Sequence, residues 1–90
     1  MNHWTFIEDS FYLKGRGLVA AIYLPGGFEC KTGDAVTVFA PNGDVFTTYI
    51  SGVSNHLSMN DTIWRASLVL KGFNSNPHMV GWLMVVHNVS

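Results

Sequence analysis

Short runs of β-branched, aromatic and aliphatic residues alternate along the chain with clusters of Gly, Pro, Asn and Asp. Strands favour residues of the first kind and tight turns favour the second, and few segments show the apolar spacing of an amphipathic helix. The pattern predicts six strands, at residues 5–13, 17–24, 35–39, 45–53, 62–73 and 80–89. We expect a bend or bulge near residues 8–10, where polar side chains interrupt the first strand.

The connections between these strands carry distinct turn signals. Pro25 cannot donate to a strand ladder, and the two glycines after it accept positive φ, so the second strand is expected to end there. Residues 31–34 are an expected turn that Asp34 orders, and the dipeptide at residues 42–43, Asn-Gly, favours a type I′ hairpin turn. Two polar segments are expected to be surface connections, residues 54–61 as the main loop and residues 74–77.

Short strands at regular spacing with tight turns predict an all-β domain, a small closed six-stranded antiparallel barrel of Greek-key type. Closure suits the composition, because only 12% of the residues are charged and an open sheet would have poorly protected edges. At 90 residues the chain is expected to form a single domain, residues 1–90.

The composition and the first residues of the chain allow a prediction of its cellular location. The longest apolar runs, such as residues 17–25, stop short of the roughly 20 residues that a bilayer helix needs. The first residues lack a basic segment followed by an apolar one, so we expect no membrane association and a cytoplasmic location. Cys30 is the single cysteine, which excludes an internal disulfide and agrees with a reducing compartment. We expect Cys30 to be a small buried residue rather than a nucleophile.

The net charge of the chain argues against tight binding to nucleic acid. The formal net charge is −1 and the chain has five Lys and Arg residues. Nucleic-acid binding draws much of its affinity from neutralised phosphates, so tight independent RNA binding does not fit these totals. A local basic patch would form if Lys14, Arg16 and Lys71 met in space.

The residues that carry chemistry form no recognisable catalytic set. Glu8 and Asp9 are adjacent in a predicted strand and should point to opposite faces, so a polar bulge is favoured over a catalytic or metal-binding pair. The four histidines have no metal-ligand spacing, and no nucleophile–base set or phosphate loop is present. We therefore expect no enzyme activity, no catalytic residues, no metal and no cofactor.

Residues 7–19 resemble the start of the second-domain β-barrel of translational GTPases, elongation factor Tu above all. There, too, an acidic pair, an aromatic residue and Gly-Arg-Gly precede a Val-rich strand, as Glu8, Asp9, Phe11 and Arg16 with its flanking glycines do here. Further segments are similar to the family in the same order: residues 31–38, 47–53, 68–73 and 80–84. The resemblance covers roughly residues 6–86 and implies a barrel like the second domain of translation factors.

In that family the domain helps to hold the aminoacylated 3′ end of tRNA, and Glu8, Asp9 and Arg16 stand at matching positions. Other positions depart from the family pattern: Leu18 and Ala21 replace threonines, Ile22 replaces a glycine, and residues 63–65 replace Gly-Asp-Asn. Such a pocket has lost hydroxyls, an amide and space, so aminoacyl-tRNA recognition in the family's manner is not expected here. Arg16 is expected to brace a loop or pair with Glu8 or Asp9, or alternatively to contact a phosphate.

Two hypotheses follow. The first is a non-enzymatic, stand-alone binding module that contacts the translation machinery: a tRNA, ribosomal RNA or a translation factor. Its candidate binding residues are Glu8, Asp9, Lys14, Arg16, Trp64, Arg65 and Lys71, with the cations on phosphates and Trp64 available for stacking. The second is a protein–protein adaptor or regulator that uses an exposed aromatic and apolar patch, and it allows for a homo-oligomer.

Overall fold

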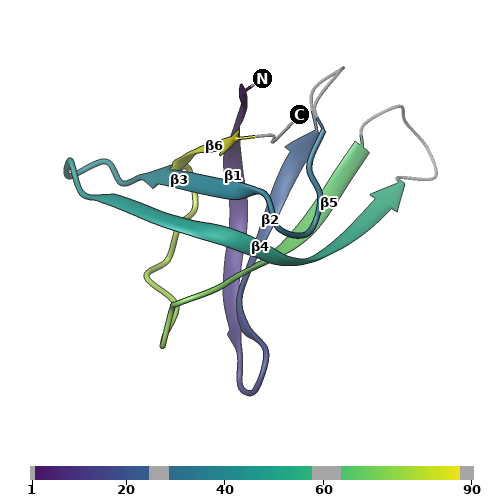
Figure 1. Cartoon of the computed structure of the whole chain (residues 1–90). Helices are drawn as coiled ribbons and strands as arrows, with labels where there is room; N and C mark the ends of the chain where they lie inside the picture. The colour runs from purple at the N-terminus through teal and green to yellow at the C-terminus, as the bar shows by residue number, and fades with distance from the viewer. Residues whose placement is uncertain (1, 25–28, 58–63, 88–90) are drawn as a thin grey trace.

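Six antiparallel strands close into a barrel in the computed structural model, which describes residues 2–24, 29–57 and 64–87. The strands are β1 (Asn2–Leu13), β2 (Gly17–Leu24), β3 (Ala35–Phe39), β4 (Val45–Leu57), β5 (Trp64–Leu70) and β6 (Leu83–His87) (Figure 1). The described residues contain no helix, and hence none of the length and apolar character needed to cross a membrane. The predicted all-β class is confirmed.

The order of strands around the barrel is β1-β2-β5-β4-β3-β6, and β6 pairs with β1 to complete the ring. Strands β3, β4 and β5 are successive antiparallel neighbours, while β6 returns to lie beside β3. This return is the Greek-key arrangement. The predicted closed, six-stranded antiparallel barrel is therefore confirmed.

Several strand boundaries agree with the sequence pattern. Strands β2 and β3 have the expected bounds. The pairing of β1 with β2 shifts register between Ile7 and Asp9, which confirms the expected bulge. Strand β1 starts earlier than expected, because its first residues pair with β6 from Asn2 opposite His87 to Phe6 opposite Leu83.

Other boundaries were wrong or lie outside the described residues. Strand β4 continues to Leu57, so residues 54–57 are strand rather than loop, because they pair with β5. The rest of the expected main loop, residues 58–61, is outside the described residues, as is the expected break at residues 25–27. Strands β5 and β6 are shorter than predicted, since turns at residues 71–72 and 80–81 flank their connection.

The β3–β4 turn has a different form from the predicted type I′. A type I′ turn needs positive φ at both central residues, but here Gly43 has φ 96° and Asn42 does not have positive φ. The Gly43 amide donates to the Ala40 carbonyl (3.1 Å) and the Ala40 amide donates to the Asp44 carbonyl (2.9 Å). Pro41 fixes its own φ near −65°, which suits a type I turn followed by a left-handed glycine.

The barrel interior is filled by apolar side chains from every strand. Its buried members are Ile7, Leu18, Ala20, Ile22, Val36, Val38, Ile50, Ala66, Leu68, Leu70, Met79, Met84 and Val86. Within β2, β3 and β6 they occupy alternate positions, as expected for strands with one face toward a core. The side chains between them therefore point outward, where a binding site must be sought.

A polar network fixes the β5–β6 connection to the bulged region of β1. The buried Ser10 hydroxyl donates to Asn76 Oδ1 (2.8 Å) and accepts from the Met79 amide (2.8 Å). Asn76 Nδ2 donates to the Ser10 carbonyl (2.8 Å), and Asn76 Oδ1 also accepts from the His78 amide (2.9 Å). These bonds hold Met79 in the core and make Asn76 the main polar anchor of the connection.

Candidate functional site

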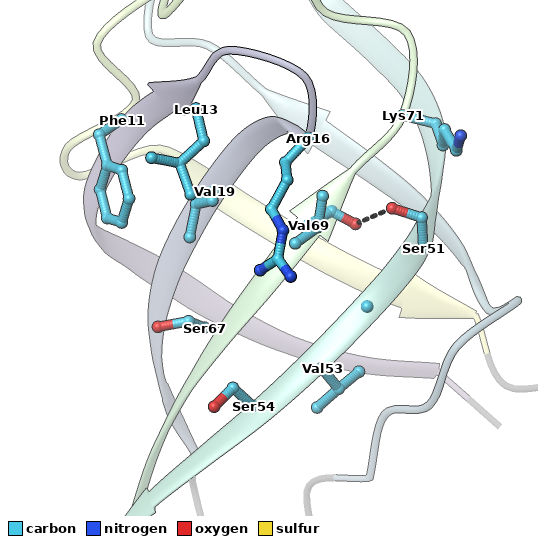
Figure 2. A pocket seen from close by; sticks show the side chains of 11 residues that line it. Phe11, Leu13, Arg16, Val19, Ser51, Val53, Ser54, Ser67, Val69 and Lys71 are labelled. Carbon is cyan, nitrogen blue, oxygen red and sulfur yellow. Dashed lines mark hydrogen bonds between the residues drawn. The ribbon is translucent and has the colours of Figure 1, made fainter.

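A groove of about 540 Å³ crosses the outside of the barrel wall formed by β1, β2, β5 and β4 (Figure 2). We call it the outer groove, and its lining residues are Phe11, Leu13, Arg16, Val19, Ser51, Gly52, Val53, Ser54, Ser67, Val69 and Lys71. Arg16 and Lys71 are the charged members of this set, and none of the lining residues is acidic. The groove thus combines an apolar floor, serine hydroxyls and two cations.

Cross-strand register builds the floor of the outer groove. Val69 lies opposite Val19 of β2 and opposite Gly52 of β4, so one outward row runs over three strands. A Cβ atom at Gly52 would lie 3.5 Å from Val69 Cγ2, so the glycine keeps this part of the floor low. Next to it, where β4 shifts register between Ile50 and Gly52, the Ser51 hydroxyl donates to the Val69 carbonyl (3.2 Å; Figure 2).

Arg16 reaches into the outer groove from the β1–β2 turn. Its amide donates to the Leu13 carbonyl (2.9 Å), which closes the turn and places residue 16 above the floor. Val19 is only 5% exposed although it does not belong to the interior cluster, so it is covered from outside the barrel. Figure 2 shows the Arg16 side chain extended over the strands between Val19 and Val69. Among the described residues its guanidinium has no ion-pair partner.

Two of the three residues of the expected basic patch lie in the same groove. Arg16 and Lys71 line the same groove, although β2, β3, β4 and β5 separate them in sequence. Lys14 is exposed in the same turn as Arg16 but is not part of the lining. Lys71 also lines a second groove of about 530 Å³, between β4 and the β5–β6 connection, whose lining includes Phe46 and Phe73 with ring centroids 5.8 Å apart.

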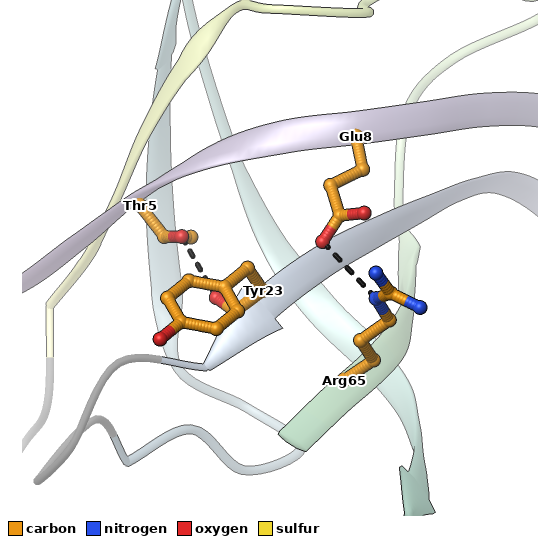
Figure 3. Close-up of polar contacts among 4 residues, drawn as sticks. All are labelled: Thr5, Glu8, Tyr23 and Arg65. Carbon is orange, nitrogen blue, oxygen red and sulfur yellow. Dashed lines mark hydrogen bonds and ion pairs between the residues drawn. The ribbon is translucent and has the colours of Figure 1, made fainter. Parts of the chain in front are cut away.

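Glu8 and Arg65 form a separate pair. Arg65 Nε lies 3.4 Å from Glu8 Oε1, and both side chains are partly exposed (Figure 3). Of the alternatives expected for Arg16, a pair with Glu8 or Asp9 is not found among the described residues, and β5 brings Arg65 to Glu8 instead. At about 3.3 Å per strand residue, Arg65 is roughly 20 Å along β5 from Lys71. A surface pair of this kind contributes only about 0–1 kcal/mol.

The remaining candidate residues have local or undescribed roles. Asp9 Oδ1 accepts from the Ser10 amide (2.8 Å), which makes it part of the bulge. Trp64 begins β5, and its backbone pairs with Leu24 and Leu57, but its side chain lies outside the described part of the chain. Its predicted role in stacking stays a prediction.

Sequence reasoning named Arg16 and Lys71 but missed the serines, the valines and Phe11 of the outer groove. Ser67, Val69 and Lys71 follow one another at every second position, which is the signal of one outward strand face. Phe11 is 43% exposed at the groove's edge. Their association depends on which strands are neighbours, and the sequence pattern alone does not specify that.

Metal ligation has no support in the described residues, which contain no group of three or more His, Cys, Asp or Glu placed to hold an ion. Asp34 is buried, and Asp34 Oδ2 accepts from the Lys31 amide (3.0 Å), as expected for a residue that orders this turn. Cys30 is half-buried beside the core. Burial, and then the nearby Asp34 carboxylate, raises the pKa of the Cys30 thiol.

We expect Cys30 to react with a thiol reagent several-fold more slowly in the folded barrel than in guanidinium-unfolded protein at the same mildly alkaline pH. The thiolate is the nucleophile, and a raised pKa reduces its fraction. The stability that the neutral thiol contributes is fully present below its pKa in the unfolded chain. It is lost as the pH rises through the folded-state pKa. Stopped-flow labelling across pH measures the rates, and equal rates in the two states would contradict the expectation.

Comparisons of the chain with protein-family models, curated proteins and solved structures give no match. The relation to translational GTPases thus rests on the sequence motifs alone. It stays a prediction.

Proposed function

We propose that this chain is a non-enzymatic binding module whose outer groove takes a phosphate-bearing single strand of RNA. The observation that carries the proposal is the presence of both Arg16 and Lys71 in the lining of a groove without an acidic lining residue. Cations and hydroxyls are the protein groups that most often contact the nucleic-acid backbone, and Ser54 supplies an exposed hydroxyl in the same lining.

Phe11 adds a second kind of contact. Its ring is 43% exposed at the edge of the groove, and base stacking on an aromatic ring contributes about 1–3 kcal/mol without sequence preference. Val19 and Val69, on either side of the Arg16 side chain, give the floor an apolar surface. A strand of RNA could thus place its phosphates on Arg16 and Lys71 and a base against Phe11.

The small number of cations determines how strongly the groove is expected to bind RNA and how that binding depends on salt. With two phosphates neutralised, the logarithm of the binding constant should fall with the logarithm of salt with a slope of about −1.4. Affinity of this kind is typically micromolar and suits a module that binds beside other contacts. The motifs shared with translational GTPases make tRNA and ribosomal RNA the first RNAs to test.

The test measures binding over a series of salt concentrations. Fluorescence anisotropy detects binding to total tRNA, and co-sedimentation detects binding to ribosomes. The double variant Arg16→Ala, Lys71→Ala should lose at least about tenfold in affinity at low salt and show a slope near zero. The matched control is Lys31→Ala, Arg65→Ala, which removes the same charge from outside the groove and should keep most of the binding.

A steric variant separates the groove from general charge. Gly52 does not have positive φ, and a Cβ there makes ordinary contacts with Val69, so Gly52→Leu can fill the groove without backbone strain. It should weaken RNA binding while leaving the melting temperature at or above that of the wild type. Equal losses in both charge variants, or no binding at low salt, would overturn the RNA proposal.

A protein–protein adaptor is the second candidate function. A different observation favours it, namely exposed aromatic and aliphatic side chains on the other half of the barrel wall, with Trp4 61% and Phe6 54% exposed.

A further inference from the structure

The outer face of β1, β6, β3 and β4 carries a continuous apolar surface. Register places Phe6, Leu83, Phe39 and Val45 opposite one another in a single row over the four strands. In the adjacent row Trp4 lies opposite Val85, and the Trp4 and Phe6 rings meet edge to face with centroids 5.9 Å apart. We call these six residues the apolar face.

This face points away from the core. Its residues alternate with the interior side chains: Met84 and Val86 are inside on β6, and Val36 and Val38 are inside on β3. Val45 is 55% exposed and Phe39 is 38% exposed. Tyr49, one row beyond the face and opposite Ala35, is 51% exposed. Exposed aromatic side chains, which the sequence analysis associated with a partner surface, are thus present on this side of the barrel.

The apolar face is at the upper end of the size range for apolar patches on monomers. An aromatic side chain carries about 150–250 Å² of surface, so the exposed fractions of these residues amount to on the order of 600 Å². The largest apolar patch on a typical monomer is about 300–600 Å², and each side of a standard protein interface buries about 800 Å². With its polar rim the face has the size of one side of such an interface.

The chemistry of the face selects its partner. The rows from Asn2 to Tyr49, from Trp4 to Thr47 and from Phe6 to Val45 contain no Asp, Glu, Lys or Arg. A two-fold interface brings the same patch of both subunits together, so any charge near the axis meets its own sign. A face without charges avoids that cost, and it also has nothing with which to select an oppositely charged partner.

Topology restricts the geometry of association. The barrel is closed, so each strand has a neighbouring strand on both sides, and β3 and β6, which carry the middle of the apolar face, are hydrogen-bonded along both edges. Packing of sheet face on sheet face, with side chains interdigitating at about 10 Å between backbones, is the remaining mode. We infer that the apolar face binds a second copy of this chain, forming a two-fold dimer that leaves both outer grooves open.

The dimer does not depend on RNA binding, and the two are tested separately. Analytical ultracentrifugation of the wild type should show a mass that rises from 10.0 kDa toward twice that value through the micromolar range. High salt should not weaken the association, since charge does not hold it. Phe39→Lys, in the centre of the row, should raise the dissociation constant at least about tenfold.

Tyr23→Lys is the matched control, because Tyr23 is 41% exposed on β2, outside the face, and its replacement should leave the dimer intact. Phe6→Lys, 54% exposed on β1, is the second face variant in case Phe39→Lys melts early. A wild type that stays monomeric at all concentrations, or a loss as large in Tyr23→Lys as in the face variants, would overturn the inference. A monomer that instead binds lipid vesicles or a different protein through the face would overturn it as well.

Discussion

Replacing Asn76 with alanine is expected to lower the free energy of unfolding by about 3 kcal/mol, at roughly 1 kcal/mol for each hydrogen bond lost. The side chain makes three such bonds, to the Ser10 hydroxyl, the Ser10 carbonyl and the His78 amide. The Ser10 hydroxyl in turn accepts from the buried Met79 amide. Loss of Asn76 therefore frees the connection that holds Met79 in the core. Guanidinium unfolding followed by circular dichroism measures the change.

Asn74→Ala is the control, because Asn74 is an exposed asparagine of the same connection and its loss should change stability by less than about 0.5 kcal/mol. A double-mutant cycle with Ser10→Ala adds a sharper criterion. Since the two side chains share one network, the double variant should lose less than the sum of the single losses. Strict additivity would contradict the role given to Asn76.

Gly17→Ala is expected to lower the free energy of unfolding by roughly 3 kcal/mol. Gly17 begins β2 with φ at 122°, a conformation that side chains rarely adopt. An added Cβ would also lie 3.3 Å from the Leu70 carbonyl oxygen, a backbone atom in the neighbouring strand that has little freedom to move. Strain and crowding thus act together at the point where β2 joins β5.

Gly15 offers the matched comparison for this prediction. It lies in the same turn with φ at 85°, and an added Cβ would have nothing within 4 Å. Gly15→Ala should therefore cost only about 1 kcal/mol. The same unfolding experiment measures both variants. Equal losses would mean that φ alone, and not the contact with Leu70, sets the cost at Gly17.

Local sequence signals accounted for most of the strands. The bounds of β2 and β3 follow from runs of apolar residues between segments of the sequence that contain glycine, and such signals act over a few residues. The end of β4 was missed because Ser54 resembles a loop residue. It belongs to a strand because it lies opposite Ser67, and that pairing depends on β5. The type of the β3–β4 turn was predicted wrongly because the prediction relied on the Asn-Gly dipeptide. In the structure, the fixed φ of Pro41 decides the turn type instead.

The candidate site was less predictable than the fold. Arg16 and Lys71 could be named, but their meeting depends on β5 lying beside β2, a long-range neighbourhood that residue types do not encode. The same neighbourhood placed Arg65 beside Glu8, outside the lining of the groove. Serines on outward strand positions carry no distinguishing signal until their neighbours are known.

The pairing of β1 with β6 brings the two ends of the described chain together. Asn2 lies opposite His87, so the described chain enters and leaves the barrel at the same place. A domain with adjacent ends can be inserted into a surface loop of a host protein without separating the host's own strands, and its ends can be joined for circular permutation. The described barrel therefore has the geometry that suits insertion into a loop or circular permutation.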